Sequence, residues 1–408
     1  MNFFIKTLGC KVNAIDSGRI SRALEISGHL VVNHEADADI VIVNSCTVTA
    51  EADRKSQQQV SRHLRRDLPV YLTGCSARVN PQNWQVKYRD NEKFQVVGDE
   101  KALLQALAIE DLLDDHTIAW SANSGQRTRL AISIQSGCDN RCRFCITRIA
   151  RGEHHSRSLS AIIEEIKAAE AAGIAEIVLT GINLAAWGCR DSNHGEESRL
   201  AFLLEAILQQ TQIPRIRLSS LGPQYLQPAF FDLFADQRLC DYLHLSLQSG
   251  SVATLQAMQR GHGVDEVRLI AESARRVRPD VALAADVITG FIGENELAHQ
   301  QSMALLAEIS FAKLHVFPYS PREGTPAAEA PFGLQHSAIA KARAEQVRDL
   351  GSRMRKTFIK GCYGKTFKVL SESGTTGLTT NYIRLKTPAD LEVGEIRELS
   401  VGDNTLAE

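Results

Sequence analysis

The chain has 408 residues, enough for two or three domains with full hydrophobic cores. Its 46 Lys and Arg residues nearly balance 48 Asp and Glu, and a net charge of -2 excludes a global field that attracts polyanions. Nine cysteines are too few for a disulfide scaffold, no run approaches 18 apolar residues, and the N-terminus is typical of a strand and not of a secretory leader. These features predict a cytoplasmic protein without a membrane span.

The first 120 residues alternate between predicted strands and helices. We expect strands at Phe3–Leu8, Ile40–Val43 and Val70–Leu72, and a helix at Ser17–Gly28. A cysteine follows each strand, namely Cys10, Cys46 and Cys75, and the separations of 36 and 29 residues match one βαβ repeat. Parallel strands end at one edge of a sheet, so the three thiols should converge there. A buried structural thiol explains any single one of them, but three at the same topological position favour ligands of an iron–sulfur cluster.

The segment Gly-Cys-Asp-Asn-Arg-Cys-Arg-Phe-Cys contains the most informative motif of the chain. Its cysteines, Cys138, Cys142 and Cys145, have the spacing C-x3-C-x2-C. Three thiolates can each bind one iron of a cubane cluster, which leaves the fourth iron open for a ligand that takes part in chemistry. The alternative is a zinc knuckle or a set of reduced core thiols. A knuckle needs a fourth ligand, and His154 and His155 do not follow a known spacing.

From Arg129 onward the sequence repeats a strand and a helix six times. Strands are expected at Arg129–Gln135, Glu176–Thr180, Arg215–Ser219, Tyr242–Gln248, Val281–Ile288 and Lys313–Phe317, with helices such as Leu159–Ala172, Leu200–Thr211 and Val264–Arg276 between them. This alternation predicts an open, partial parallel (β/α)6 barrel, whose site lies at the carboxyl ends of its strands. Small or polar residues crowd those ends: Gly181, Asn183, Ser219, Ser220, Ser246, Gln248, Asp286, Gly290, Tyr319 and Ser320. Each alone is more typical of a turn, but together they predict a polar mouth above the cysteine loop.

The tail differs in composition from the rest of the chain. Residues 341–368 carry nine Lys or Arg, and short strand-like runs follow at Thr366–Leu370, Tyr382–Leu385 and Glu395–Ser400. Together they predict a small antiparallel β-barrel of about 50 residues. Small barrels that are flanked by basic residues often bind nucleic acid. A solvent-exposed helix followed by a small stabilising domain explains the same pattern.

The cysteine loop resembles that of the radical S-adenosylmethionine (SAM) enzymes, and its continuation narrows the resemblance to the methylthiotransferase family. The motifs that carry it are Thr7-Leu8-Gly9-Cys10-Lys11-Val12-Asn13, Asn44-Ser45-Cys46-Thr47-Val48-Thr49, Thr73-Gly74-Cys75, Ala150-Arg151-Gly152, Ser156-Arg157-Ser158, Leu245-Ser246-Leu247-Gln248-Ser249-Gly250 and Val316-Phe317-Pro318-Tyr319-Ser320-Pro321-Arg322. The residues after Cys10 and Cys46 look most like the branch that acts on tRNA N6-threonylcarbamoyladenosine. The resemblance covers essentially the whole chain and implies three domains: residues 1–120 for an auxiliary cluster, 125–357 for the radical SAM core, and 358–408 for a shortened TRAM-like RNA-binding domain.

The resemblance implies two [4Fe–4S] clusters with different tasks. Cys138, Cys142 and Cys145 would hold the catalytic cluster that binds SAM and makes a 5′-deoxyadenosyl radical, which removes hydrogen from carbon 2 of the modified adenosine. Cys10, Cys46 and Cys75 would hold the cluster that carries the sulfur, methylated by a second SAM. The expected cofactor contacts are Gly181, Asn183, Ser219, Ser246, Gln248 and Asp286. The expected partners are the anticodon loop of tRNA, an electron donor such as flavodoxin or ferredoxin, and a sulfur donor.

Other features of the sequence leave alternatives open. The arginines around the loop, Arg141, Arg143, Arg148, Arg151 and Arg157, could contact tRNA phosphates or form salt bridges. Cys189, Cys240 and Cys362 are interpreted as incidental thiols. Several positions depart from the family pattern near the barrel mouth: Thr147-Arg148, Gly222, Val252 and Ile292. Alternative functions are methylthiolation of isopentenyladenosine in tRNA, methylthiolation of a ribosomal protein, and a non-catalytic iron–sulfur RNA-binding or electron-carrier role.

Overall fold

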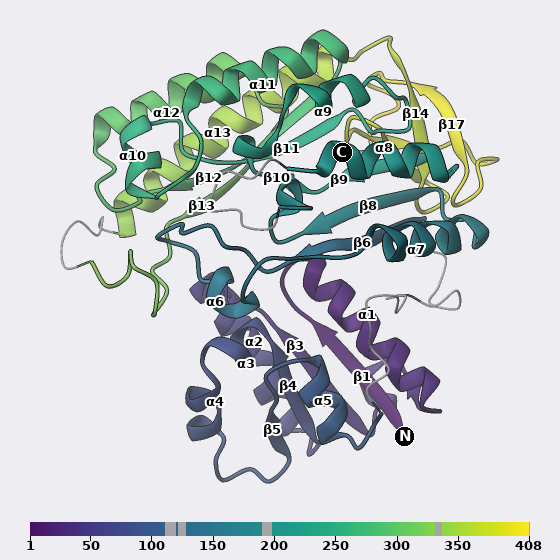
Figure 1. The fold of residues 1–408 in the computed structure, drawn as a ribbon, viewed down its shortest axis with the longest axis vertical. Coiled ribbons are helices and arrows are strands. Elements are labelled where there is room, and N and C mark those ends of the chain that lie inside the picture. Colours follow the sequence, from purple (N-terminus) through teal and green to yellow (C-terminus); the bar gives the residue numbers. More distant parts are fainter. Residues whose placement is uncertain (111–119, 121–127, 190–197, 331–336, 408) are drawn as a thin grey trace.

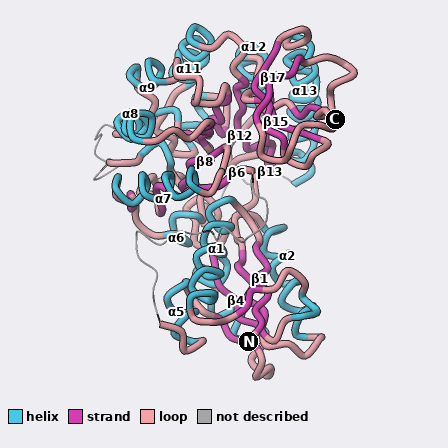
Figure 2. Tube along the Cα trace, turned by 90° about the vertical axis from the view of Figure 1, so that its right-hand side faces the viewer, coloured by secondary structure: helices cyan, strands magenta, loops and turns pink. Residues whose placement is uncertain are grey.

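A computed structural model of the protein describes residues 1–110, 120, 128–189, 198–330 and 337–407. The chain forms two lobes, with the N-terminal domain below and the remainder of the chain above (Figures 1 and 2). The linker expected between residues 120 and 125 lies outside the described residues. Among the described helices, none combines the length and the apolar character needed to cross a bilayer.

The N-terminal domain is an open parallel sheet in the order β2-β1-β3-β4-β5, as predicted. Its strands are β1 (Asn2–Thr7), β2 (Leu30–Val31), β3 (Ile40–Ser45), β4 (Val70–Gly74) and β5 (Phe94–Val96). Its helices are α1 (Lys11–Ile26), α2 (Ala50–Leu64), α3 (Cys75–Val79), α4 (Pro81–Lys87) and α5 (Glu100–Ala106), with a 3-10 turn at Glu35–Asp37. One buried cluster unites Phe3, Leu24 and Leu103, and a second unites Val60 and Trp84, so both faces of the sheet are covered.

Helix α1 begins six residues before the predicted helix. Lys11 follows directly on Cys10, whose extended backbone (φ -93°) starts the helix without a side-chain cap. Val12 and Ile15 are buried three residues apart in the first turn. The turn is therefore held by packing, and the polar residues Lys11, Asn13 and Asp16 around it hid this from the periodicity of the sequence.

The central domain contains six parallel strand positions, which confirms the predicted partial barrel. The described strands form two sheets, β7-β6-β8-β9 and β10-β11-β12-β13, and β9 and β10 are separated by one residue, Ser219. The strands are β6 (Arg129–Ser136), β7 (His155–Ser156), β8 (Glu176–Gly181), β9 (Arg215–Leu218), β10 (Ser220–Leu221), β11 (Tyr242–Gln248), β12 (Ala282–Thr289) and β13 (Lys313–Pro318). The helices are α6 (Thr147–Arg151), α7 (Leu159–Ala171), α8 (Leu200–Gln210), α9 (Pro228–Leu233), α10 (Val252–Ala257), α11 (Val264–Val277), α12 (Glu296–Ile309) and α13 (Ser337–Gly361), with 3-10 turns at Leu184–Ala186 and Pro223–Tyr225.

Helix α13 contains most of the basic run of the tail, and it packs on β12 and β13 (Figure 1). Arg343 within it is buried and donates hydrogen bonds to the carbonyl and carboxylate oxygens of Glu294, at 2.7 and 2.9 Å. Part of the basic run therefore belongs to the barrel wall. The helix also continues past residue 357, where the sequence suggested a domain boundary.

The chain ends in a small antiparallel β domain, as expected. Its sheet has the order β16-β15-β14-β17, with β14 (Thr366–Ser371), β15 (Thr376–Thr379), β16 (Arg384–Lys386) and β17 (Ile396–Ser400). Strand β15 was not predicted, because Gly and Thr residues there resemble a turn. Two buried arginines of β9 bind this domain to the barrel: Arg215 donates to the carbonyl oxygen of Leu378 at 2.9 Å, and Arg217 to that of Thr380 at 2.9 Å.

Candidate active site

The three N-terminal cysteines lie at the carboxyl ends of neighbouring parallel strands. Cys10 follows β1, Cys46 directly follows β3, and Cys75 directly follows β4 as the first residue of α3. Strand β3 pairs with both β1 and β4, and the pairing registers bring these ends to one edge of the sheet. The structure therefore brings Cys10, Cys46 and Cys75 together, although the chain separates them by 65 residues in total.

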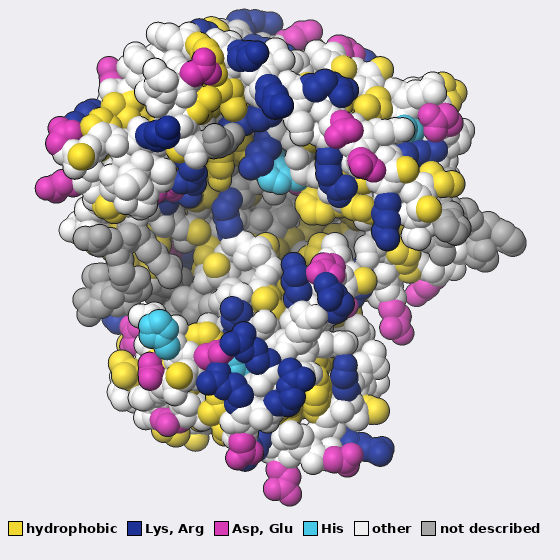
Figure 3. All heavy atoms as spheres, turned by 180° about the vertical axis from the view of Figure 1, so that it is seen from behind, with side chains coloured by type: hydrophobic (Ala, Val, Ile, Leu, Met, Phe, Trp, Pro, Cys, Tyr) yellow, Lys and Arg dark blue, Asp and Glu magenta, His cyan; other side chains and the backbone are white. Residues whose placement is uncertain are grey.

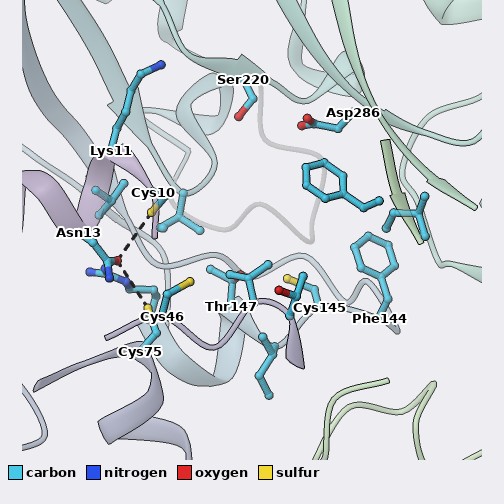
Figure 4. Close-up of a pocket in the computed structure, with 18 of the residues that line it drawn as sticks. Cys10, Lys11, Asn13, Cys46, Cys75, Phe144, Cys145, Thr147, Ser220 and Asp286 are labelled. Carbon is cyan, nitrogen blue, oxygen red and sulfur yellow. Dashed lines mark hydrogen bonds between the residues drawn. The ribbon is translucent and has the colours of Figure 1, made fainter. Parts of the chain in front are cut away.

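Asn13, which the sequence reasoning missed, organises this group. Its amide nitrogen donates to the carbonyl oxygens of Leu8 (2.9 Å) and Ser45 (2.8 Å), so the orientation of the carboxamide is fixed. Its oxygen then accepts hydrogen bonds from the thiols of Cys10 and Cys75, both at 3.7 Å (Figure 4). One buried side chain thus holds two of the three cysteines from the same point. Asn13 follows the cysteine by three residues in the motif, which is the only signal that could have identified it.

The last residue of β4, directly before Cys75, must be glycine. Gly74 has a φ of +88°, and a Cβ atom there would lie 2.3 Å from Oδ1 of Asn44. Only glycine combines that backbone conformation with such a close approach. The turn places Cys75 at the start of α3, with its side chain toward the other two thiols (Figure 4).

The second set of cysteines lies on the loop between β6 and α6. Gly137 begins this loop with a φ of +66°, and a Cβ atom there would lie only 1.6 Å from the carbonyl oxygen of Glu153. The loop closes on itself, because the backbone N–H of Cys138 donates to the carbonyl oxygen of Gly152 at 3.1 Å. The N–H of Cys145 donates to the carbonyl oxygen of Cys142, also at 3.1 Å. The loop therefore presents its three cysteines in a conformation that hydrogen bonds of its own backbone maintain.

Burial affects the ionisation of these thiols. It raises the pKa of Cys138 to about 11, and it also raises the pKa values of Cys145, Cys46 and Cys75. The charge of neighbouring cysteine thiolates adds to the effect on Cys138, Cys145 and Cys46. Thiolates crowded in this way need a cationic group among them, as a metal cluster provides.

The spacing of the thiols within each set determines whether they suit a single metal ion or a larger cluster. In the described part of the chain, no three His, Cys, Asp or Glu side chains lie close enough to bind one metal ion. A cubane cluster places each thiolate on a different iron, so its ligands stand farther apart than those around one ion. Thiolates are the ligands that iron–sulfur clusters use, and each set supplies three. The donor chemistry of the thiols therefore fits iron–sulfur ligation.

One cavity of about 450 Å³ between the two lobes is lined by all three N-terminal cysteines and by one cysteine of the loop (Figure 4). Cys10, Cys46 and Cys75 line it from the N-terminal domain, and Cys145 lines it from the cysteine loop. Most of the polar mouth expected from the sequence also faces it: Gly181, Ser219, Ser220, Gln248, Asp286, Tyr319 and Ser320. Apolar side chains complete the wall, among them Phe144, Ile288 and Phe317.

Two of the expected cofactor contacts lie outside the cavity wall. Asn183 is buried, and its side chain donates to the hydroxyl of Tyr225 at 3.2 Å. Ser246 contributes its carbonyl oxygen, which accepts a hydrogen bond from Arg260 at 2.8 Å. Arg260 also donates to the sulfur of Cys142 at 3.2 Å, so Ser246 supports the residue that contacts the cysteine loop. Nothing in the sequence around Arg260 indicated that contact.

The arginines around the cysteine loop have different surroundings in the structure: some form buried salt bridges and others are exposed. Arg151 pairs with Asp16 at 2.6 Å and also donates to Asn13, so it joins the loop helix to the N-terminal domain. Arg157 is buried and pairs with Glu165 at 2.6 Å. Arg141 and Arg148 are exposed. Salt bridges thus account for two of the five arginines, and two others remain on the surface.

Two features of the barrel strands were also missed. His244 faces the cavity, and its Nε2 atom lies 3.0 Å from Oδ1 of Asp286. His315 stacks on His244 with ring centroids 4.8 Å apart. Gln248, at the end of β11, has a φ of +70°, a conformation rare outside glycine and often found at functional sites. Single polar residues inside apolar strands gave no periodic signal.

Of the departures from the family pattern, Thr147 lines the cavity, and the other four lie outside its wall. Arg148 is on α6, and Gly222 packs beside the ring of Tyr225. Val252 is an exposed residue that begins α10, and Ile292 packs against a small apolar cluster that includes Phe291. Cys189, Cys240 and Cys362 are buried and do not line the cavity.

Two family models match the chain. The Uncharacterized protein family UPF0004 matches residues 2–97, and the Radical SAM superfamily matches residues 132–306. The matched segments contain the first and the second cysteine set, respectively.

Three relatives cover most of the chain. The threonylcarbamoyladenosine tRNA methylthiotransferase MtaB of Rickettsia prowazekii is 31% identical in an alignment that covers 96% of this chain and 93% of that protein. MtaB of Thermotoga maritima is 33% identical and covers 90% of this chain and 86% of its own. The tRNA-2-methylthio-N(6)-dimethylallyladenosine synthase of Paracoccus denitrificans is 32% identical, and the match covers 90% of this chain and 85% of that protein. The relatives thus carry names for two different adenosine modifications.

Solved structures share the fold at low sequence identity. The radical SAM methyltransferase TsrM of Kitasatospora setae superposes with a TM-score of 0.61 at 14% identity, over 80% of this chain and 76% of its own. The cobalamin-dependent radical SAM enzyme OxsB gives a TM-score of 0.52 at 11% identity, over 86% of this chain and 56% of its own. At such identities the likeness shows the architecture alone.

Proposed function

Because the chain belongs to the radical SAM methylthiotransferase family, we propose that it adds a methylthio group to carbon 2 of N6-threonylcarbamoyladenosine, beside the anticodon of tRNA. The observation that carries the proposal is the shared cavity: Cys10, Cys46 and Cys75 line it together with Cys145 of the loop. A reaction that joins a radical step to sulfur delivery requires that arrangement. The names of the two MtaB relatives support threonylcarbamoyladenosine as the substrate.

Each cysteine set holds one [4Fe–4S] cluster in this proposal. Cys138, Cys142 and Cys145 bind the cluster that engages SAM, and Cys10, Cys46 and Cys75 bind the auxiliary one. When bound, the two groups supply the electron that cleaves SAM to a 5′-deoxyadenosyl radical and the iron at which sulfur is methylated and delivered, with two SAM molecules consumed per turnover. The supporting geometry is the Asn13 contact, which holds two auxiliary thiols toward the cavity.

Residues of the barrel bind SAM and keep the cavity dry. Gly181, Ser219, Gln248 and Asp286 offer backbone and side-chain polar groups at its wall, which suits the polar parts of SAM. Asn183 and Ser246 support the site from behind through Tyr225 and Arg260. The half-buried side chains of Phe144 and Ile288 cover apolar surface of the wall and exclude water, which would otherwise react with the radical.

The tRNA binds over the mouth of the cavity in this proposal. Figure 3 shows Lys and Arg side chains on both sides of the hollow between the lobes. Exposed Arg141 and Arg148, on the cysteine loop and α6, are candidates for phosphate contacts near a splayed base. Residues 358–408 form the shortened TRAM-like domain, residues 1–120 the auxiliary-cluster domain, and residues 125–357 the radical SAM core. The protein acts in the cytoplasm, where an electron donor such as flavodoxin or ferredoxin and a sulfur donor complete the cycle.

Nucleoside analysis of tRNA from a strain that lacks this gene tests the proposal. We expect the 2-methylthio derivative of threonylcarbamoyladenosine to disappear and to return when the wild-type gene is restored, but not with a Cys138→Ala gene. Persistence of that nucleoside would refute the substrate assignment. Loss of the methylthio derivative of isopentenyladenosine, or of the modification on a ribosomal protein, would identify the alternative substrate.

A further inference from the structure

One cationic side chain in the cavity has no counter-ion among the described residues. Lys11, Arg151 and His244 line the wall. Arg151 pairs with Asp16 at 2.6 Å, and His244 lies 3.0 Å from Asp286. Within the described ranges, Lys11 makes no ion pair, and it lies directly after Cys10 at the start of α1. Figure 4 shows its side chain extending from the cysteines along the cavity toward the level of Ser220.

Lys11 faces the ring of Tyr382, near which Arg129 pairs with Glu372 and Arg217 pairs with Glu176. Burial would raise the pKa of Tyr382, but the charges of Lys11, Arg129 and Arg217 lower it below its usual value. The ammonium of Lys313 lies 5.7 Å from the centre of the same ring. Among the described residues of the cavity wall, the only carboxylate is that of Asp286, which is already paired with His244. An anionic group that enters this side of the cavity therefore finds cations and no free acid in the described wall.

The substituent of the proposed substrate supplies such an anion. A threonylcarbamoyl group on N6 ends in a carboxylate and a hydroxyl, whereas an isopentenyl group ends in two methyl groups. Carbon 2 and carbon 6 of adenine are both bonded to N1, so the reacting carbon and the N6 substituent share one edge of the base. If carbon 2 approaches the auxiliary cysteines, the substituent lies beside the residue that follows Cys10.

We propose that the ammonium group of Lys11 binds the carboxylate of the N6 substituent and thereby selects an acidic modified adenosine over an apolar one. This inference rests on the proposed function, because it takes a modified tRNA adenosine as the substrate. A carboxylate buried among apolar walls requires a charged partner, and Lys11 is the lining cation free to provide it. Lys11 is exposed in this structure, so a substrate that lacks the negative charge covers the ammonium and leaves it desolvated and unpaired, and it binds less well.

Binding of anticodon stem-loop RNA to the reconstituted protein tests this without turnover. Two RNAs are compared, one with threonylcarbamoyladenosine and one in which the carboxylate is converted to its methyl amide. We expect the wild-type protein to bind the acid about tenfold to a hundredfold more tightly, since a hydrogen bond to a charged group is worth about 1.5–3 kcal/mol. In Lys11→Met the preference should fall to about onefold, and Lys11→Arg should restore part of it.

Lys55→Met is the matched control. It removes a lysine of the same domain that pairs with Glu51 outside the cavity wall, so it lowers RNA affinity through net charge alone and keeps the acid preference. Equal wild-type affinity for the two RNAs would overturn the inference, as would a preference that survives in Lys11→Met.

The proposed function has its own readout in the same experiment. This readout is the methylthiolation of the acidic RNA by wild-type protein in the presence of SAM and reductant. Turnover of both RNAs with equal kcat/KM refutes the role of Lys11 and leaves the proposed function standing. Acid-selective binding with no methylthiolation of the threonylcarbamoyl RNA refutes the proposed substrate and leaves the carboxylate contact standing.

Discussion

Arg151 and Asp16 form an ion pair of 2.6 Å that connects the two cysteine sites. Arg151 ends α6, directly beyond the cysteine loop, and Asp16 lies in the second turn of α1, which begins after Cys10. The Arg151 side chain is only 3% exposed and also donates to Asn13, which holds two auxiliary thiols. Relative motion of the two lobes therefore requires the breaking of a buried ion pair.

Loss of Arg151 should weaken the auxiliary site as well as stability. Arg151→Met leaves Asp16 without its partner, and breaking a buried pair in this way costs about 3 kcal/mol. We expect a lower urea midpoint and fewer than the full number of bound irons after reconstitution. Arg151→Met combined with Asp16→Asn serves as the control, because it removes both charges and should recover part of the stability. A double variant as unstable as the sum of the single ones would contradict the pairing.

The two cysteine sets should bind iron independently. A Cys138→Ala, Cys142→Ala, Cys145→Ala variant should keep about four irons of the auxiliary cluster, and the matching Cys10→Ala, Cys46→Ala, Cys75→Ala variant should also keep about four. Iron analysis after anaerobic reconstitution measures both numbers. Only the second variant should form 5′-deoxyadenosine from SAM and dithionite. Complete loss of iron from either triple variant would show that the sites depend on each other.

Arg260 should raise the reduction potential of the cluster on the loop. Its guanidinium donates to the sulfur of Cys142 at 3.2 Å, and a positive donor stabilises the reduced, more negative cluster. Arg260→Met should lower the midpoint potential by about 60 mV or more, equivalent to the loss of one charged hydrogen bond. Redox titration followed by electron paramagnetic resonance provides the measurement, and Arg260→Lys should shift the potential less. An unchanged potential in Arg260→Met would rule out this role.

A methyl group at Gly137 should destroy the loop cluster, because a Cβ atom there overlaps the carbonyl oxygen of Glu153. Gly173 provides a matched control: its φ of +77° is as restrictive as the +66° of Gly137, but a Cβ atom at Gly173 would meet no neighbouring atom within 4 Å. Gly173→Ala should therefore cost only about 1–2 kcal/mol of backbone strain and retain the cluster. The charge-transfer absorbance of the reconstituted proteins distinguishes the two variants. Normal absorbance in Gly137→Ala would contradict the loop geometry.

Acid should weaken the contact between the barrel and the C-terminal domain. Burial alone would raise the pKa of Glu176, but Arg217 and Arg215 lower it to about 2 in the folded protein. A carboxyl group whose pKa is lowered on folding stabilises the protein above its ordinary pKa, near 4.5, and loses that contribution as the pH falls toward 2.

Glu176→Gln removes the titrating group. We expect the free energy of unfolding of this variant to be about 3 kcal/mol lower than that of the wild type at pH 7. This difference in stability should shrink as the pH falls from about 4.5 to about 2. Urea unfolding across this range measures the gap. The exposed pair of Glu51 and Arg54 is the control, and Glu51→Gln should follow the wild-type curve. A gap that is constant with pH would contradict the role of Glu176.

The sequence predicted the two parallel sheets and the convergence of Cys10, Cys46 and Cys75, because strand ends follow from local hydrophobic pattern and topology. It did not predict Asn13, Arg260 or the pairing of His244 with Asp286. Each of these depends on a contact between segments far apart in the chain, which no local period encodes. The start of α1 was also missed, because a short apolar pattern interrupted by polar residues gives no clear helical signal.

Both lobes present the carboxyl ends of parallel strands to the same cavity, and this has a consequence for assembly on the ribosome. The domain with Cys10, Cys46 and Cys75 is synthesised first, and its sheet is completed by β5 before the barrel exists. Its thiols are therefore in place while the face that they will share with Cys145 is still open to solvent. The cavity is completed only after β13 and the next residues, Tyr319 and Ser320, have been synthesised and folded. The N–H of Ala50 then donates to the Ser320 hydroxyl at 3.2 Å. These three thiols are thus accessible from solvent before the cavity closes.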